Sequence, residues 1–451
     1  MRYLSHLLVI LIAIAWPSQQ ALAQSILRDA ETEALLNDMA EPLVEASGLT
    51  PGNVDMVLIN DQSINAFVAG GQAVYMHSGL LNAADSALEV QGVIAHEIGH
   101  ITGGHIVRFN EGTSAASNIS LLSLLLGVGA ALAGATEAGI GIVQAGQRAA
   151  LGKFLAFNRV QESAADAAGA EFLSYAGISG RGSLAFFAKL RSQEFRYGRS
   201  QDDDSAFTRT HPLSGDRIAT LRETYIADPA WDKPVDPELQ ARFMRVKAKL
   251  YGYLSTPRQT LNKYPLSDTS VAARYARAYA YHKDALVSEA LAEAEGLIQI
   301  DPLDPYFLEL QGQILLESGM PEQAIPALRK ATELSGNEPL IASMFGHALI
   351  ATEDPEQFAE AEQVLRTAVA RDRFNPFAWY QLGVVYAAKG DEPRARLASA
   401  EQQVMRRRYP DAIRSAQVAE AGLEPGTPDW IRAQDIGLQA RAALEQIRDS
   451  Q

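Results

Sequence analysis

The sequence predicts an α+β protein in two parts: a mainly helical N-terminal domain with a small β-sheet, followed by an all-α solenoid of repeated helical pairs. Three observations predict this arrangement. Short β-branched runs lie on either side of a double glycine, a helical pattern with two histidines four positions apart follows, and the C-terminal part repeats every 34 residues. The length of 451 residues is ample for two domains.

The N-terminus has the pattern of a secretory signal. Arg2 precedes an apolar run over residues 7–15, and small residues in segment 21–23 precede a cleavage site at Gln24. Because the run is too short to span a membrane, we expect residues 1–23 to be removed on export, the alternative being a retained anchor. The chain has no cysteine, so neither a disulfide framework nor a thiol-linked lipid anchor is expected.

The charge balance argues against nucleic acid as a partner. The net charge is −15, and 47% of the residues are hydrophobic, which is typical of a soluble globular protein. The basic cluster over residues 406–408 is isolated on a predicted helix, where a solvated helix face is the simpler interpretation.

The N-terminal domain begins with strand patterns. Residues 54–59 are apolar and β-branched, and the runs 64–69 and 73–77 flank the double glycine at 70–71, which predicts a hairpin. A helical pattern then begins near Leu88 and continues through the histidine pair.

The histidine pair predicts a metal site. His96 and His100 are one helical turn apart and share a helix face, so both imidazoles can bind one ion. Glu97 is turned about 100° from His96 and can reach a water molecule activated by the metal instead of the metal itself. This His-Glu-Ile-Gly-His segment contains two metal ligands and a general base, the smallest set of groups that a zinc hydrolase requires.

A catalytic zinc usually has a third protein ligand. The position six residues after His100, where one zinc-site pattern has a histidine, is Ile106. Glu162 is preferred as the third ligand because Asp166 lies one helical turn beyond it and can hold the outer ring nitrogen of a ligand histidine. The other downstream candidates are Glu111, Glu137 and Glu171.

Composition divides the chain after the metal motif. All candidate metal ligands fall within residues 24–232, which are expected to form one domain, and residues 233–267 are expected to form a helical linker. In the stretch 228–237, which is rich in Asp, Pro and Trp, Asp236 followed by Pro237 has the pattern of a helix start.

Residues 268–451 are predicted to be a tetratricopeptide-repeat domain. Pro305 and Pro339 are 34 residues apart, and small residues recur at the same interval where the two helices of a unit must approach closely. We expect a degenerate first unit, three clearer ones, and a capping helix over 429–449. The alternative is a helical bundle without repeats.

The segment 119–143 is unusually apolar for a soluble domain. It begins with a leucine-rich stretch and continues with small residues, but Glu137 interrupts it. Three interpretations remain open: a buried hairpin, contact with a membrane surface, or a membrane span.

These motifs together resemble the HtpX-like and CAAX-prenyl-protease-like zinc metallopeptidases, most closely the exported subgroup with C-terminal tetratricopeptide repeats. The resemblance covers nearly the whole mature chain and implies a zincin-like fold. It implies that Asn65, Ala66 and Phe67 form a substrate-binding edge strand. It also implies that His211, between Thr210 and Pro212, faces the metal cleft and that Arg217 stabilises the oxyanion.

The expected function is that of a periplasmic zinc endopeptidase. One Zn²⁺ per chain is bound by His96, His100 and Glu162, and Glu97 acts as the base. The resemblance implies that the substrates are misfolded or stalled outer-membrane proteins and that the repeats bind the β-barrel assembly machinery. The alternative is a chaperone or adaptor with a latent zinc site. No special role is expected for the other histidines considered, which are His77, His105, His282 and His347.

Overall fold

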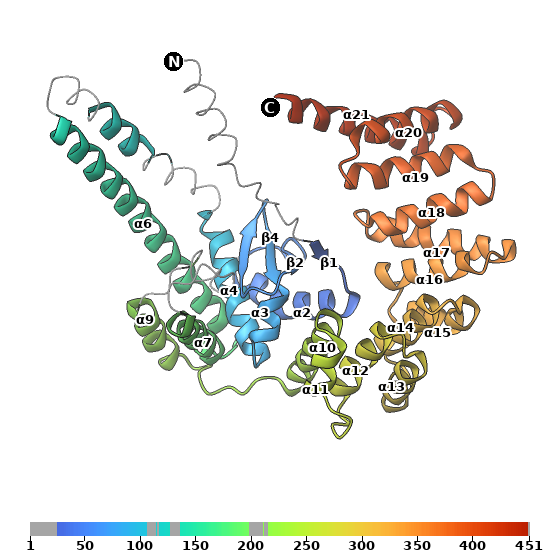
Figure 1. Ribbon diagram of the computed structural model, residues 1–451, viewed down its shortest axis with the longest axis horizontal. Helices are drawn as coiled ribbons and strands as arrows, with labels where there is room; N and C mark the ends of the chain where they lie inside the picture. The colour runs from blue at the N-terminus through green and yellow to red at the C-terminus, as the bar shows by residue number, and fades with distance from the viewer. Residues whose placement is uncertain are drawn as a thin grey trace, which may run out of the picture.

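The computed structural model describes residues 25–105, 114, 117–126, 136–197, 211 and 215–449. The expected signal segment, residues 1–23, lies outside the described residues, as do Thr210 and Pro212. Figure 1 shows a small sheet with helices packed on it in the N-terminal half and a curved row of antiparallel helices in the C-terminal half. The predicted α+β class and the all-α second part are confirmed.

The described residues form one four-stranded sheet with the order β1-β2-β4-β3. Strand β2 pairs in parallel with β4, whereas β1 with β2 and β3 with β4 pair antiparallel. Gly70 and Gly71, both with positive φ, form the turn between β3 and β4, so the predicted hairpin is confirmed. The strands are β1 (Ser25–Leu27), β2 (Asp55–Asn60), β3 (Ala66–Ala69) and β4 (Ala73–His77).

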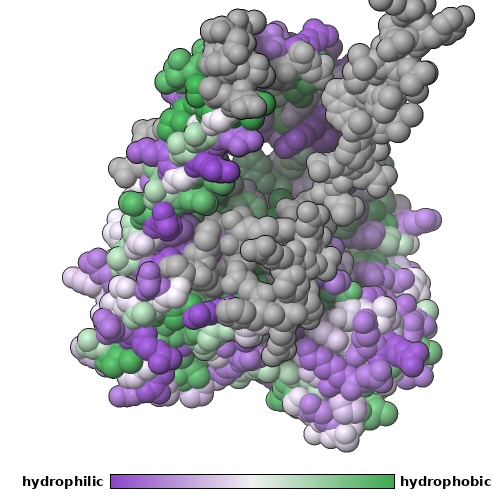
Figure 2. All heavy atoms as spheres, turned by 60° about the vertical axis from the view of Figure 1, so that its left-hand side comes forward, coloured by the Kyte–Doolittle hydropathy of each residue, from purple (hydrophilic) through white to green (hydrophobic). Residues whose placement is uncertain are grey.

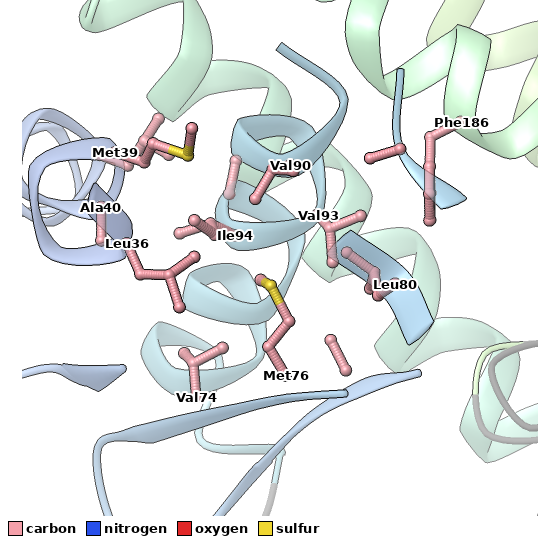
Figure 3. Close-up of a cluster of buried hydrophobic side chains, with 14 of the residues drawn as sticks. Leu36, Met39, Ala40, Val74, Met76, Leu80, Val90, Val93, Ile94 and Phe186 are labelled. Atoms are coloured by element: carbon pink, nitrogen blue, oxygen red, sulfur yellow. The ribbon is translucent and has the colours of Figure 1, made fainter. Parts of the chain in front are cut away.

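The core of the N-terminal domain lies between the sheet and the helices that cover it. In Figure 3, Val74 and Met76 of β4 point towards Ile94 of α4, and Leu36 of α2 closes the layer. Burying such side chains is the main stabilising contribution to a domain of this kind. The helices are α2 (Ala30–Ala46), α3 (Ser78–Ala83), α4 (Ala87–Thr102), α6 (Thr136–Tyr175), α7 (Arg181–Tyr197) and α9 (Gly215–Ile226).

Helices α4 and α6 cross at two glycines. A Cβ on Gly99 would lie 2.6 Å from the carbonyl oxygen of Ala165, and one on Gly169 would lie 3.1 Å from the backbone of Ala95. Only glycine allows this approach, because any side chain would force the helices apart. The crossing therefore sets the distance between the histidines of α4 and the acidic residues of α6.

Helix α6 projects from the domain beside a short helix at residues 117–126 (Figure 1). The leucines of this short helix are about half exposed or more, which contradicts the interpretation of 119–143 as a buried hairpin for the described part. Figure 2 brings this side forward and shows hydrophobic residues beside hydrophilic ones on the projection. The exposed leucines are Leu121, Leu122, Leu124, Leu125 and Leu126. Among the described residues, no helix is long and apolar enough to cross a membrane.

The segment expected to be a linker contributes to the N-terminal core. Helix α10 (Pro237–Leu254) begins with the Asp236 side chain accepting a hydrogen bond from the Glu238 amide, so the predicted helix start is confirmed. Its Phe243, Val246 and Leu250 are buried in the same cluster as the sheet and α4. A boundary at residue 232 would therefore remove core side chains. Helix α11 (Pro257–Lys263) follows it.

The C-terminal half consists of antiparallel helical pairs. Gly312 packs against Leu328 and Gly346 against Leu365, so small residues lie where the two helices of a unit meet. Proline at the first turn starts several of these helices. The helices, apart from the short η2 before α17, are α12 (Val271–Lys283), α13 (Val287–Ile300), α14 (Pro305–Glu317), α15 (Pro321–Leu334), α16 (Pro339–Ala351), α17 (Phe358–Arg371), α18 (Pro376–Ala388), α19 (Glu392–Met405), α20 (Tyr409–Gly422) and α21 (Pro428–Asp449).

Ion pairs and one apolar contact join the two halves. Arg28 lies 2.9 Å from Asp372 at the end of α17, and Arg245 of α10 lies 2.6 Å from Asp304 at the start of α14. Ala30 at the start of α2 is buried among side chains of α14, α15 and α16. The N-terminal strand β1 is thereby held against the inner face of the repeats.

Candidate metal centre

Helix α4 presents the three residues of the histidine motif. The Ser86 side chain caps its N-terminus by accepting a hydrogen bond from the Glu89 amide, and the second histidine lies in the last turn of the helix. His96, Glu97 and His100 are all buried. The helical geometry expected from their spacing is present.

Four potential metal ligands converge at one point. His96, His100, Glu162 and His211 each offer a ligand atom, and these atoms lie within 4.8 Å of one another. The Nε2 atoms of His96 and His100 are 3.1 Å apart, and Nδ1 of His211 lies 3.1 Å from Oε1 of Glu162. Glu162 reaches this point from α6, across the glycine crossing. Of the other predicted third-ligand candidates, Glu171 is described and is not part of this cluster, whereas Glu111 and the side chain of Glu137 lie outside the described residues.

Mutual contacts set the charges in the cluster. Burial opposes ionisation of Glu162, but hydrogen bonds from His100, His211 and His96 hold its pKa well below the usual range. Burial also opposes the charged form of His96, yet Asp166 and Glu162 raise its pKa to about 10. For His100, burial prevails and lowers the pKa. The ionised carboxylates that stabilise a proton on His96 can stabilise a metal cation in its place.

Asp166 and Arg217 lie behind the ligands. Oδ1 of Asp166 is 3.0 Å from Nδ1 of His96, as the sequence predicted for a residue that orients this ring. Arg217 donates to Asp166 through Nε at 2.6 Å and Nη2 at 2.8 Å, and its Nη1 lies 3.1 Å from Glu162. Burial opposes its charge, but the Asp166 hydrogen bond raises the pKa of Arg217. This guanidinium therefore holds two carboxylates in position. Its contacts differ from those expected of a group that stabilises the oxyanion.

Glu97 is completely buried, and neither of its carboxylate oxygens has a hydrogen-bond partner among the described residues. The Nε2 atom of His211 lies 3.5 Å from Oε1 of Glu97. Burying an unsatisfied carboxylate is costly, so such a group is expected only where another polar molecule completes its contacts. This observation fits a water molecule beside a metal ion.

The donor set fits a metal ion of intermediate softness. Imidazole nitrogens and one carboxylate, without thiolates, are ligands that zinc accepts in catalytic sites. Asp166 behind His96 supplies the outer contact that metal-bound histidines usually have. The four side chains therefore satisfy the requirements for one buried cation.

His105 contacts a candidate ligand and lines the cleft, although no special role was expected for it from the sequence. Gly104, with a φ of 63°, reverses the chain after α4, and Nδ1 of His105 then lies 2.9 Å from Nδ1 of His100. The second ligand histidine thus has an outer partner of its own. A spacing of five residues is not typical of one helix face, so only the glycine turn could have indicated this contact.

A cleft of about 320 Å³ opens onto the metal ligands. Phe67 and Val68 of β3 line it together with Glu97, His100 and His211. Phe67 is held by stacking on Tyr75, with ring centroids 5.2 Å apart. Two of the three residues expected to bind substrate, Asn65 and Ala66, are buried and do not line this cleft. β3 is an edge strand of the sheet, so its backbone is the part that can pair with another strand.

Comparison with known proteins agrees with this geometry. Residues 27–225 match the model of peptidase family M48, and residues 306–338 match the tetratricopeptide repeat. The chain is 24% identical to the beta-barrel assembly-enhancing protease of Escherichia coli strain K12, over 92% of this chain and 83% of that protein. The corresponding protein of Yersinia pestis is 25% identical over 92% of this chain and 85% of its own length. Metalloprotease LoiP of Escherichia coli is 31% identical over 40% of this chain and 64% of its own length.

Proposed function

We propose that this chain, whose residues 27–225 match peptidase family M48 and whose residues 306–338 match the tetratricopeptide repeat, is a zinc endopeptidase of the bacterial periplasm that cleaves unfolded or misassembled outer-membrane proteins. The observation that carries this proposal is the buried Glu97 carboxylate, which has no hydrogen-bond partner among the described residues and lies beside four converging ligands.

Zinc would be held by His96, His100 and Glu162, one ion per chain. When bound, zinc supplies Lewis-acid activation of water and of the scissile carbonyl. Glu97 accepts the proton of the attacking water, because its carboxylate is within the cleft and is not occupied by another donor of the described residues. Asp166 keeps the ring of His96 oriented, and Arg217 holds both Asp166 and Glu162 in position.

The substrate would bind as an extended strand along β3. An edge strand offers backbone groups to any unfolded segment, and this mode selects for extended chain rather than for one sequence. Phe67 and Val68 lie on the wall of the cleft, so their side chains would contact the residues next to the scissile bond. Asn65 and Ala66 would contribute through their backbone, since both side chains are buried.

His211 would act as a latch on the resting enzyme. Its Nδ1 lies 3.2 Å from Nε2 of His96 and 3.1 Å from Glu162, close enough to fill the fourth ligand position. A fourth protein ligand leaves no position for water, so turnover requires His211 to move away. After such a movement the imidazole remains near the cleft and can stabilise the oxyanion.

His211→Ala should raise the peptidase rate at matched zinc content. A rate that falls would favour the oxyanion role, and an unchanged rate would exclude His211 from the mechanism.

The repeats would recruit the enzyme to the machinery that assembles outer-membrane β-barrels. The relatives' name and the concave surface typical of such repeats support this part of the proposal.

The second candidate function is an adaptor in which the repeats carry the function and the zinc site is latent. The contacts of His211 with His96 and Glu162 favour this candidate, because a site closed by His211 would be latent.

The projection formed by residues 117–126 and α6 would rest on a membrane surface. Five exposed leucines lie on the short helix, and residues 138–161 of α6 carry Arg148, Lys153 and Arg159 but no acidic residue, in a chain of net charge −15. Apolar side chains with neighbouring cations suit an anionic lipid surface.

Leu122→Ser with Leu125→Ser should abolish co-sedimentation with phosphatidylglycerol vesicles. Equal sedimentation of the variant and the parent would refute the contact.

The peptidase proposal is tested by Glu97→Gln. This variant should keep its zinc, because the amide replaces a side chain that does not bind the metal, and should cleave unfolded casein about 10²–10⁴-fold more slowly. Zinc content by elemental analysis and casein cleavage are measured on the same sample. Cleavage at the parental rate would reject Glu97 as the base. If Glu97→Gln does not cleave casein but still supports assembly of outer-membrane proteins in cells, the adaptor candidate is favoured.

A further inference from the structure

A groove larger than the active-site cleft lies on the inner face of the repeats. Its volume is about 540 Å³, and it is bounded by β1 and by the helices α10, α12, α14, α16 and α18. Most of its surface is apolar, with Leu316, Met344 and Phe377 among the lining residues. The position of β1 relative to α14 and α16 can be followed in Figure 1.

One buried carboxyl group on the wall of this groove lacks a partner. Glu309 of α14 is 8% exposed, and its Oε2 has no hydrogen-bond partner among the described residues. No hydrogen bond or ion pair of the described residues compensates it, in contrast to Glu162 in the metal centre. A buried carboxyl group without a partner is costly, so a site that keeps one is expected to receive a complementary group from elsewhere.

The neighbouring cations are already engaged. Lys249, which also lines the groove, is held 2.5 Å from Asp29 and 3.3 Å from Glu31. Arg28, at the β1 end, lies 2.6 Å from Glu33 and 2.9 Å from Asp372. Both cations are therefore paired with carboxylates other than Glu309, which leaves Glu309 for a ligand.

The rest of the groove fits a polypeptide segment with a long basic side chain. Gln313 and Glu317 continue the row of Glu309 along α14 at intervals of four residues, so polar groups follow one face of the helix. The apolar walls suit the methylene stem of lysine or arginine, whose charged end can reach the carboxyl group. The edge strand β1, with Ile26 exposed, offers backbone groups to an extended chain beside it.

We propose that this groove is a second polypeptide-binding site, which takes an extended apolar segment through a lysine or arginine side chain paired with Glu309. The pair is a charge-assisted contact in surroundings that exclude most water, where such contacts are strongest. Pairing also removes the cost of the unsatisfied carboxyl group. The site is separate from the cleft at the metal centre, because the two share no lining residue.

The test measures binding without cleavage. The full mature chain with zinc and the Glu97→Gln substitution is titrated into a fluorescein-labelled apolar nonapeptide with a central lysine, and into the same peptide with norleucine in place of lysine. Norleucine keeps the apolar stem and lacks the ammonium group. We expect the lysine peptide to bind about 10-fold or more tightly than the norleucine peptide, as for a buried hydrogen bond to a charged group.

The assignment to Glu309 comes from matched variants in the same background. Glu309→Gln should remove the preference for lysine, and Glu309→Leu should in addition strengthen binding of the norleucine peptide. Glu333→Gln is the control, since Glu333 is exposed on α15 and pairs only with Lys330 among the described residues. A parent protein that binds both peptides equally, or binds neither, overturns the proposal, as does a lysine preference that survives in Glu309→Gln. Since no cleavage is measured, such a failure would leave the peptidase proposal standing.

Discussion

Two buried glutamates, one in each half of the molecule, have opposite surroundings. Glu162 in the metal centre contacts three histidines and an arginine, and these hydrogen bonds hold its pKa well below the usual range despite burial. For Glu309 in the repeats, burial raises the pKa to about 8, and the charge of Lys249 only partly opposes this. The same side chain is thus a stable anion at one position and mainly a neutral acid at the other near pH 7.

The difference distinguishes two kinds of site. The partners of Glu162 converge on one point, which suits a resident cation with fixed coordination geometry. Glu309 has a wide apolar groove in front of it and lacks such partners, which suits a ligand that arrives and leaves. A buried carboxylate with several partners therefore fits a permanent function, and a buried carboxyl group without them fits an exchangeable contact.

The largest effect is expected at Glu162. Glu162→Ala removes one of the three ligands proposed for zinc and the anion that balances the histidines, so zinc should be lost on dialysis and casein cleavage should disappear. Glu171→Ala, an exposed position farther along α6, serves as the matched control. Elemental analysis of both variants after dialysis gives the result. Full zinc retention in Glu162→Ala would mean that another residue is the third ligand.

A smaller effect is expected at Asp166, which contacts the ligands and not the metal. Asp166→Asn weakens the hold on Nδ1 of His96 and removes the charge that Arg217 balances, so zinc affinity should fall by about 10–100-fold. Competition with a chromophoric chelator measures this affinity, and Asp216→Asn at the exposed start of α9 is the comparison. An affinity equal to that of the parent would exclude Asp166 as an orienting residue.

The smallest effect is a change in the pH dependence of stability at Glu309. Burial raises its pKa from 4.5 to about 8, with Asp29, Glu338 and Glu31 adding to the rise against the opposing charge of Lys249. Between these pH values the folded protein binds one proton more than the unfolded chain, so stability contributed here is lost as pH rises.

Glu309→Gln carries no proton to lose. The melting temperature of this variant, relative to the parent, should therefore increase from pH 5 to pH 8. Thermal unfolding followed by circular dichroism at both pH values measures this difference. A relative melting temperature that is constant, or that decreases with pH, would contradict a raised pKa at Glu309.

Local spacing was sufficient to predict the elements around the metal centre. A spacing of four positions from His96 to His100 fixes a shared helix face, and the same spacing from Glu162 to Asp166 indicated a ligand with its supporting carboxylate. The double glycine predicted the β3–β4 turn, and Asp236 before Pro237 predicted the start of α10. In each case neighbouring residues determine the structure.

Features set by distant contacts could not be predicted in this way. Arg217 braces Asp166 and Glu162 only because α9 packs near α6, and His105 meets His100 only because Gly104 reverses the chain. Glu309 lacks a partner because Lys249 and Arg28 pair with Asp29 and Asp372. Both of these aspartates are remote from Glu309 in the sequence. The apolar run at 119–126 has the composition of a buried segment, yet most of its leucines are exposed.

The central claim is that His96, His100, Glu162 and His211 together hold one zinc ion in the resting enzyme. X-ray absorption at the zinc edge, on the purified mature chain with its zinc content measured, tests this directly. The account predicts one zinc per chain with four nitrogen and oxygen ligands at about 2.0–2.2 Å, three of them imidazoles, and two imidazoles after His211→Ala. A parent spectrum with fewer than three imidazoles, a spectrum that His211→Ala leaves unchanged, or a chain that binds no zinc would contradict it.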